Sequence, residues 1–511
     1  MRNALRLINR FRGDRGGNIA VIFGIAVVPL ISAVGCAVDY SMATRMKAKL
    51  QSAADAASVA SISQKSPGYT AAAAMTGNGS VTAGVTDSNN IFDGDMTGIS
   101  GYTNLSRTST VTKTGVKLAS TITFSADVPV TFMKVLGYQK LTLTGSSSST
   151  ASLPPYLDFY LMLDVSGSMG LASTPGEQTR LSNINPDNFT NYPTGCTFAC
   201  HFSPPNSCGN STQKYPTGNA CMGYPVSRVS YSGYQNVLSH NSGHLPNSMI
   251  TAGLPNSLNT DPTWGLSAVS ACSTPGTDSC IQLRADAVGY AVQQLFSTAN
   301  ATMSVASQFR IGLYPFIRFL YAYFPLTSSI NGSDTNSSTI NYAAKNLASQ
   351  LDTNANANLG SGGTHFENAF PTMNTTITTV GDGTSPTNRL PYVFLVTDGA
   401  QDPQTKGING GSWAGSNHAT VLNPTTLCKP LKDRGIMVAV LYIPYQPISP
   451  ENTTFAGGED VYANANIANI PASLQGCASP NFFFTANTPA DITAALDAMF
   501  KKALVTAHIT N

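Results

Sequence analysis

One apolar run, Ile19 to Val38, constrains this 511-residue chain more than any other feature. The run contains no charged residue and, as a helix, is long enough to cross the roughly 30 Å hydrocarbon core of a bilayer. Five arginines precede it, offset only by Asp14, and this basic excess favours a cytoplasmic N-terminus. We therefore expect a basic tail at 1–18, one membrane-spanning helix at 19–38, and export of the rest of the chain.

Two other interpretations of the run are open. A cleaved signal peptide normally has a shorter apolar core and a small-x-small exit. A lipoprotein would use Cys36, which follows Ala33, Val34 and Gly35. The length of the run favours an uncleaved anchor over both.

Beyond the membrane, residues 39–63 remain strongly helical, with alanines at helical spacing around Leu50, Ala53, Ala54 and Ala57. This pattern predicts either a stalk or a packing helix of the kind found in pilins.

The composition points to an exported protein. Charged residues make up 11% of the chain, against about a quarter in typical soluble domains. The net charge of +2 gives no basic surface for nucleic acid, so we expect no nucleic-acid partner. Eight of the nine cysteines lie downstream of the apolar run, which predicts disulfides in an oxidising compartment without fixing their pairing.

The sequence of residues 64–153 predicts a small β-rich module. Its first part, to about Thr110, is polar and has weak periodicity, so no element is predicted there. Val116, Leu118, Ile122 and Phe124 then alternate with polar residues, as on one face of a strand. Residues 145–150 are interpreted as a Ser-rich linker that Pro154-Pro155 closes.

The chemistry-bearing motif follows that linker. An apolar strand over 156–163 leads into Asp164-Val165-Ser166-Gly167-Ser168, where a carboxylate and two hydroxyls can converge on one point. A Gly362-Gly363-Thr364 loop offers another hydroxyl, and a second apolar strand, 390–396, ends in Thr397-Asp398-Gly399. Hard oxygen donors of this kind suit Mg²⁺ or Mn²⁺. In an open α/β sheet, two such loops meet outside the carboxyl ends of the strands.

These residues resemble the metal-ion-dependent adhesion site of von Willebrand factor A domains. The resemblance implies that Ser166 and Ser168 ligate the ion directly, and that Thr364 binds directly or through water. Asp164 and Asp398 would act mainly through bridging waters. A remaining coordination position would accept an Asp or Glu carboxylate of a protein partner.

The predicted fold class is α/β, a Rossmann-like, doubly wound, mostly parallel sheet of the von Willebrand factor A type, spanning 154–511. Its further elements are expected as helices at 283–296, 341–351 and 490–504 and strands at 309–319 and 435–445. About 110 residues, roughly 170–282, separate the first metal loop from the first helix and hold six cysteines. We expect a disulfide-rich insertion that forms a lid or recognition surface beside the site, or an inert insertion.

Within this insertion, Cys196-Thr-Phe-Ala-Cys200-His201 has one residue too many for the usual haem-attachment motif. Disulfide pairing is favoured by the surrounding cysteines. A zinc site of Cys196, Cys200, Cys208 and His201 is a weaker alternative in an oxidising compartment.

The N-terminus resembles that of TadG-like proteins of the Tad (Flp) pilus-assembly group. The resemblance rests on Gly17-Asn18-Ile19-Ala20-Val21-Ile22-Phe23, Val38-Asp39-Tyr40 and Ala53-Ala54-Asp55-Ala56-Ala57. It implies a single-pass protein of the bacterial inner membrane whose periplasmic or surface-exposed bulk assists pilus assembly or adhesion. No acidic residue occurs from Asn18 to Val38, so pilin-like processing is not expected.

Two functions of other classes remain as alternatives. A structural envelope spacer with a vestigial metal loop needs no ion. A periplasmic hydrolase would need a nucleophile and base, for which Ser166 and His365 are the nearest candidates, but no hydrolase motif such as G-x-S-x-G is present. We therefore expect a protein that is not an enzyme.

Overall fold

The computed structural model describes residues 17–184, 197, 224, 227–240, 269–352, 356–360, 362–402, 420–445, 447, 451 and 459–509. The chain divides into two compact units, Met1–Pro154 and Pro155–Asn511.

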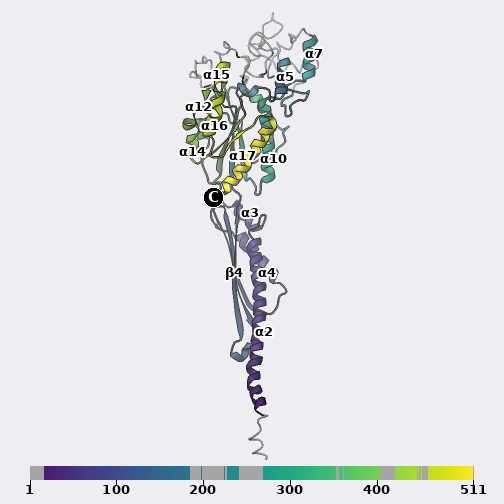
Figure 1. The fold of residues 1–511 in the computed structure, drawn as a ribbon, viewed down its shortest axis with the longest axis vertical. Helices are drawn as coiled ribbons and strands as arrows, with labels where there is room; N and C mark the ends of the chain where they lie inside the picture. The colour runs from purple at the N-terminus through teal and green to yellow at the C-terminus, as the bar shows by residue number, and fades with distance from the viewer. Residues whose placement is uncertain are drawn as a thin grey trace, which may run out of the picture. The chain divides into compact units, whose positions relative to one another are not determined.

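The first unit is organised around one long helix, α2 (Gly17–Ala60), which runs through Pro29 without a break (Figure 1). The predicted apolar helix is therefore present and continues into the Ala-rich segment. Over Val21–Ala60 it is long and apolar enough to cross a membrane, and only 6% of its most apolar window is buried. Exposed apolar side chains in such a continuous run mark a membrane or protein contact surface.

The second half of α2 packs on a four-stranded sheet of order β1-β2-β3-β4. Its strands are antiparallel: β1 (Gly79–Ser80), β2 (Thr103–Thr114), β3 (Lys117–Pro129) and β4 (Lys140–Ser152). Ala53, Ala54 and Ala57 are buried in this contact, since small side chains let the helix approach the sheet closely. Figure 1 shows α2 alongside β4. Residues 39–60 thus form a packing helix rather than an isolated stalk.

One expectation for this unit was wrong, and one segment contains helices that the sequence did not predict. Residues 145–150 are not a linker but the second half of β4, paired with β3 from Lys117↔Ser152 to Pro129↔Lys140. Their serines alternate between half-buried and exposed positions, so a Ser-rich composition concealed a period of two. The segment 64–110 also contains two helices, α3 (Pro67–Ala74) and α4 (Thr82–Met96), and α4 is held by buried Phe92 and Met96 despite its poor helix formers.

The second unit contains a six-stranded sheet of order β12-β11-β8-β5-β6-β7. All neighbours are parallel except the edge strand β7, which is antiparallel to β6. The strands are β5 (Leu157–Asp164), β6 (Phe309–Phe316), β7 (Phe324–Thr327), β8 (Leu390–Thr397), β11 (Met437–Tyr442) and β12 (Phe483–Thr485). Numbered along the chain, this is the Rossmann-like order 3-2-1-4-5-6. The predicted mostly parallel α/β sheet is confirmed.

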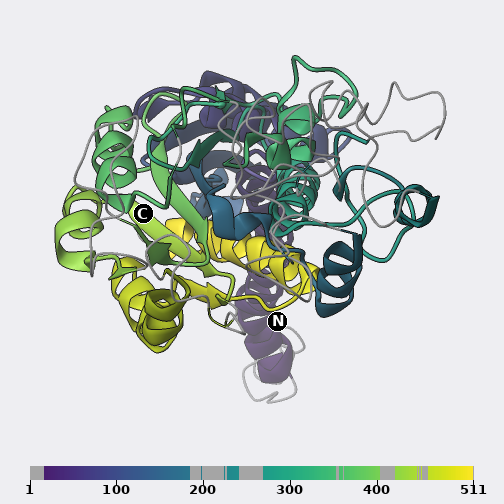
Figure 2. The same cartoon turned by 90° about the horizontal axis from the view of Figure 1, so that it is seen from above.

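Helices cover both faces of this sheet (Figures 1 and 2). One core lies under α10 (Arg284–Thr302), α11 (Ile340–Lys345) and α17 (Pro489–Ile509). The other lies under α12 (Phe366–Thr376), α14 (Lys429–Asp433) and α16 (Ile470–Cys477). Successive side chains of β5 enter the two cores alternately, Phe159 and Leu161 into the first and Tyr160 and Met162 into the second. This double coverage explains why β5 is a continuous apolar sequence.

The shorter elements complete the unit. They are η2 (Gly167–Gly170), α5 (Pro175–Ile184), α7 (Tyr231–His240), η4 (Leu347–Gln350), β9 (Ala400–Gln401), β10 (Thr420–Val421), α13 (Pro424–Leu427), α15 (Glu459–Asn466) and η7 (Ile467–Asn469).

The described parts of the insertion contain helices that the sequence did not predict, α5 and α7. Disulfides join Cys272 to Cys280 and Cys428 to Cys477. The disulfides expected for Cys196, Cys200, Cys208 and Cys221, and the weaker zinc alternative that adds His201, concern positions outside the described residues.

Candidate metal centre

The first predicted metal loop begins where β5 ends, and the loop bearing Asp398 begins where β8 ends. These strands are parallel neighbours, paired from Leu157↔Leu390 to Leu163↔Val396. Their carboxyl ends therefore lie at the same edge of the sheet, with Asp164 and Asp398 following adjacent strands. Both carboxylates are fully buried.

Hydrogen bonds link four of the five predicted side chains, two of these bonds being short. The Ser166 hydroxyl donates to Asp164 Oδ1 at 2.6 Å, and Thr364 Oγ1 donates to Ser166 Oγ at 2.7 Å. The Ser168 hydroxyl lies 3.4 Å from that of Ser166. The backbone N–H of Ser166 also donates to Asp164 Oδ1 at 3.0 Å, which fixes the turn. The structure thus brings residues 198 positions apart in the sequence into direct hydrogen-bond contact.

The loop before α12 delivers the third hydroxyl. Gly363 has a φ of +102°, and a Cβ there would meet Asp402 Cβ at 2.5 Å, so only glycine allows this turn. The following Thr364 is held by its carbonyl, which accepts from Asp402 N at 2.9 Å. Its side chain is buried and directed to Ser166.

The fifth predicted residue, Asp398, is electrostatically close to Asp164. Burial raises the pKa of Asp164 to about 7, and the negative charge of Asp398 adds to the rise. Burial likewise raises the pKa of Asp398, opposed by the Arg284 guanidinium and by the neighbouring Ser168 hydroxyl. Because their negative charges are unfavourable in this buried position, a cation bound beside these two carboxylates would be stabilised.

Two further residues of the site were not predicted. Thr397 Oγ1 donates to Asp164 Oδ2 at 2.6 Å and so holds the oxygen that Ser166 leaves free. Arg284, at the start of α10, places Nη1 3.5 Å from Asp398 Oδ2 and donates from Nη2 to Pro444 O at 2.9 Å. Thr397 directly precedes Asp398 in the sequence, so its hydroxyl is a signal that the sequence offers. Arg284 had no local signal because its partner is 114 residues away.

The donor set fits a hard divalent cation. Asp398 Oδ1 is buried and accepts no hydrogen bond from any residue that the structure describes. An orphaned carboxylate oxygen of this kind is costly unless something else pairs with it. Within the described ranges, no three His, Cys, Asp or Glu side chains form a metal-binding cluster. The candidate set has two carboxylates and three hydroxyls, so it suits Mg²⁺ or Mn²⁺ rather than a thiolate- or imidazole-seeking metal.

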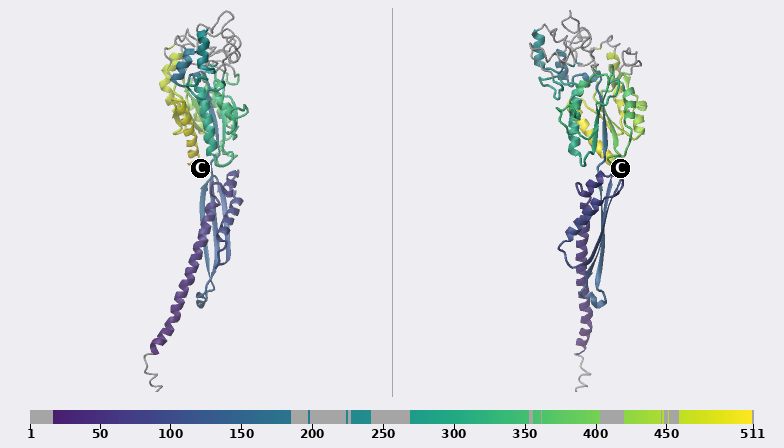
Figure 3. Two further views of the ribbon diagram at one scale, coloured as in Figure 1. Left: turned by 90° about the vertical axis from the view of Figure 1, so that its right-hand side faces the viewer. Right: turned by 180° about the vertical axis from the view of Figure 1, so that it is seen from behind.

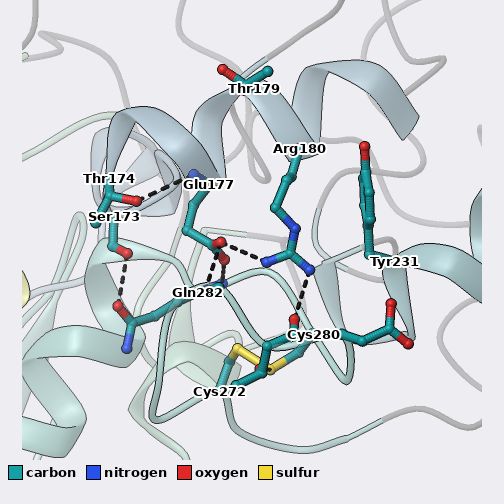
Figure 4. A network of polar contacts seen from close by, with 12 residues as sticks. Ser173, Thr174, Glu177, Thr179, Arg180, Tyr231, Cys272, Cys280 and Gln282 are labelled. Carbon is teal, nitrogen blue, oxygen red and sulfur yellow. Dashed lines mark hydrogen bonds and ion pairs between the residues drawn. A yellow bond between two sulfur atoms is a disulfide. The ribbon is translucent and has the colours of Figure 1, made fainter.

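The insertion leaves the metal loop through a buried polar network (Figure 4). The Glu177 carboxylate, 1% exposed, accepts from Gln282 N at 2.7 Å, Gly276 N at 2.9 Å and Arg180 Nη1 at 2.6 Å. Arg180 also donates to Thr277 O at 2.6 Å. These hydrogen bonds of Glu177 and Arg180 join the start of the insertion to its end. The Cys272–Cys280 disulfide closes the loop that supplies Gly276 and Thr277.

His365 does not form a catalytic pair with Ser166 or Thr364 through hydrogen bonds. Its Nδ1 contacts Glu367 Oε1 at 2.5 Å and its Nε2 contacts the Gly362 carbonyl at 3.1 Å. Both ring nitrogens are therefore engaged elsewhere, and the Ser166 hydroxyl is directed to a carboxylate. His365 is therefore not placed as the general base of a Ser166 nucleophile.

Fold and site together define a class: a protein with an apolar, membrane-type N-terminal helix and an α/β domain of Rossmann-like strand order whose loops gather hydroxyls and carboxylates. Residues 17–74 match the family model described as putative Flp pilus-assembly TadE/G-like (Tad). Over this segment the chain is similar to that family. No curated protein sequence matches it.

Solved structures with similar folds were also found. The PilB minor pilin from Streptococcus sanguinis is 10% identical, with a TM-score of 0.33 over 78% of each chain. The vWF domain of the type V pili tip protein Mfa5 from Porphyromonas gingivalis is 13% identical, with a TM-score of 0.27 over 44% of this chain and 89% of that one. BatB from Bacteroides thetaiotaomicron is 13% identical, with a TM-score of 0.25 over 44% of this chain and 89% of that one.

Proposed function

We propose that this protein is a membrane-anchored, extracytoplasmic assembly or adhesion factor of a Tad (Flp) pilus system. In this proposal, the second unit binds a protein partner through a divalent ion, and the ion accepts an Asp or Glu carboxylate from that partner. The anchor is the apolar part of α2 in the bacterial inner membrane, with the N-terminus cytoplasmic. The protein is not an enzyme.

One observation carries the proposal: the interlinked oxygens of Asp164, Ser166 and Thr364 stand at the sheet edge beside Asp398, whose Oδ1 has no hydrogen-bond partner among the described residues. Ser166, Ser168 and Thr364 would hold the ion, and Asp164 and Asp398 would act mainly through water. Few direct carboxylate ligands leave a divalent ion electron-poor, so it attracts an external carboxylate.

The test is calorimetric titration of Mg²⁺ and Mn²⁺ into the full chain in detergent, produced in an oxidising compartment. We expect binding that Asp164→Ala abolishes. The matched control is Asp433→Ala, because Asp433 is an exposed aspartate of the same unit whose ion pair with Lys429 is an i,i+4 contact on the surface. Binding that survives in Asp164→Ala would refute the assigned site.

A second titration addresses the partner. Once Mn²⁺ is bound, a peptide with an accessible Asp or Glu should perturb the Mn²⁺ electron paramagnetic resonance spectrum, whereas the Asn or Gln version should not. If both peptides act equally, or neither acts, a carboxylate does not complete the coordination.

The spacer alternative is favoured by one specific contact. The Arg284 guanidinium supplies positive charge 3.5 Å from Asp398 Oδ2, so the site has an internal cation. A vestigial loop could be stabilised by it without an ion. Unchanged pilus assembly in Asp164→Ala, together with no metal binding in the parent, would favour this alternative.

A further inference from the structure

The turn between β3 and β4 carries an exposed apolar surface that the proposed function does not use. We call residues 131–139 the tip; it includes the short helix η1 (Met133–Leu136). Four of its large side chains are exposed: Phe132 by 43%, Val135 by 75%, Leu136 by 58% and Tyr138 by 54%. A hairpin turn in water normally carries polar residues. Apolar side chains gathered on so short a turn indicate a contact surface.

The tip is held firmly to α2. The Asp39 carboxylate, 3% exposed, accepts from the backbone N–H groups of Thr131, Phe132 and Met133 at 2.8–3.0 Å. These bonds join the helix to a turn more than 90 residues away. Figure 3 shows this turn beside the lower part of α2. The tip therefore has a fixed height on the helix.

The position on α2 at which the tip is attached lies within the apolar run. Phe132 packs against Gly35 so closely that a Cβ on the glycine would meet Phe132 Cβ and Cγ at 2.4 Å. Gly35 precedes the end of the run at Val38 by three residues, or about 4.5 Å along a helix. A membrane that covers the run up to Val38 therefore covers the ring of Phe132 as well.

The surface is continuous between helix and tip. One apolar groove is lined by Leu30, Ile31, Val34, Gly35, Val38 and Phe132. Leu30, Ile31 and Val34 are exposed by 64%, 59% and 59%, so the groove opens outward rather than into the sheet. Because five of the six lining residues belong to the apolar run, lipid that surrounds the run also fills this groove.

The polar groups of the tip suit the interface between lipid and water. Tyr138 combines an apolar ring with a hydroxyl, as residues at this level of a membrane do. Lys134 is exposed and can reach lipid phosphates. The buried Asp39 carboxylate already accepts from backbone donors of the tip, so it needs little water.

We propose that the tip is a second membrane anchor, inserted into the leaflet at the carboxyl end of the apolar run with Phe132, Val135, Leu136 and Tyr138 among the lipids. The inference rests on membrane insertion of α2 and not on metal binding. With two points of contact, helix and tip, the first unit cannot rotate freely about the helix axis at the membrane surface. The partner is the lipid surface itself.

Tryptophan quenching in vesicles tests this. The full chain is reconstituted into vesicles of phosphatidylcholine and phosphatidylglycerol in which some acyl chains are brominated near the glycerol end. Leu136→Trp reports the tip. Val59→Trp is the matched control, an equally exposed (58%) aliphatic position of α2 that lies about 36 Å further along the helix than Gly35. Ile25→Trp, 71% exposed within the run, is the positive control.

We expect bromine to quench the added emission of Leu136→Trp by about half, as for a side chain at interfacial depth. Ile25→Trp should be quenched and Val59→Trp should not. Quenching of Leu136→Trp by aqueous iodide instead would overturn the proposal. Protection from both quenchers would also overturn it, because the tip would then be covered by protein, such as a second copy of this chain. Absence of quenching in Ile25→Trp would refute the membrane insertion on which the proposal rests.

Discussion

The two units use different interactions to hold their elements together. In the first, α2 meets its sheet through alanines and hydroxyls, and Ser58 Oγ contacts Ser147 Oγ at 3.0 Å and Ser149 Oγ at 2.9 Å. The second unit contains buried ion pairs. In one of them, between Arg228 and Asp286, both side chains are at most 2% exposed.

The difference matters because neutral and charged contacts fail differently. Loss of a hydroxyl contact costs about 1 kcal/mol, whereas an unpaired buried charge costs several times more. The first unit should therefore tolerate the loss of a hydroxyl at its helix–sheet contact, and the second should be sensitive to the loss of a charge at the edge where we place ligand binding. A site that must hold two carboxylates in place needs such a rigid frame.

Asp286→Ala should have the largest effect. The substitution leaves the buried Arg228 guanidinium without the carboxylate to which it donates from Nη1 at 2.8 Å and from Nη2 at 2.5 Å. It also removes the oxygens that accept hydrogen bonds from Leu283 N and Cys272 N. We expect the free energy of unfolding of the second unit to fall by about 3–5 kcal/mol. Urea titration followed by hydrogen exchange of β5 measures it. Asp433→Ala, at an exposed pair, should change it by less than about 1 kcal/mol. Equal effects would remove the proposed contrast.

Arg284→Gln sharpens the contrast at the metal loop itself. Without the metal, the second unit should lose about 1–3 kcal/mol, because Asp398 loses a buried partner and Pro444 O loses a donor. Removal of a positive charge beside Asp398 should at the same time tighten Mn²⁺ binding by about tenfold. Calorimetry on the variant and on Arg284→Lys, which keeps the charge, separates charge from packing. Unchanged Mn²⁺ affinity in Arg284→Gln would show that the guanidinium does not face the ion.

The sequence predicted most of the second unit because its strands are apolar on both faces and end in oxygen-bearing loops, so that Asp164 and Asp398 identified the same sheet edge. It did not predict Arg284, since a long-range ion pair leaves no periodic signal. In the first unit, residues 145–150 were misassigned because serine is a linker residue by composition. Their pairing depends on β3, and their place against α2 depends on Ser58, both far away in sequence. Composition describes local preference, and here tertiary contacts override it.

Ser58→Ala measures the neutral side of the comparison. The variant loses the hydroxyl that contacts Ser147 and Ser149 while keeping a small side chain in a fully buried position. We expect the first unit to be destabilised by about 1 kcal/mol, detected as faster exchange of β4 amides. Ser63→Ala is the control, since its hydroxyl donates locally to Ala60 O in an exposed position. A loss as large as that of Asp286→Ala would contradict the neutral character of this contact.

The smallest expected effect on stability concerns Asp127, a buried, ion-paired carboxylate of the first unit like those of the second unit. Asp127 accepts from Asn104 Nδ2 at 2.9 Å, Lys140 Nζ at 2.5 Å and Thr142 Oγ1 at 2.7 Å. These hydrogen bonds, that of Asn104 first, lower its pKa to about 2. Because the folded pKa lies below the unfolded value of about 3.9, the stabilisation is complete above that value and is lost as the pH falls from about 4 to about 2.

Hydrogen exchange of β3 and β4 between these pH values, corrected for intrinsic exchange rates, should therefore show progressive loss of protection in the parent. In Asp127→Asn, which cannot titrate, that component of the pH dependence should be absent. Lys140 is 55% exposed, so added salt should weaken its contribution and leave that of the two neutral donors. If the pH dependence were equal in both proteins, Asp127 would not be its source. The acid sensitivity of the first unit would then come from another carboxylate, with Asp39 at the tip as the next to test.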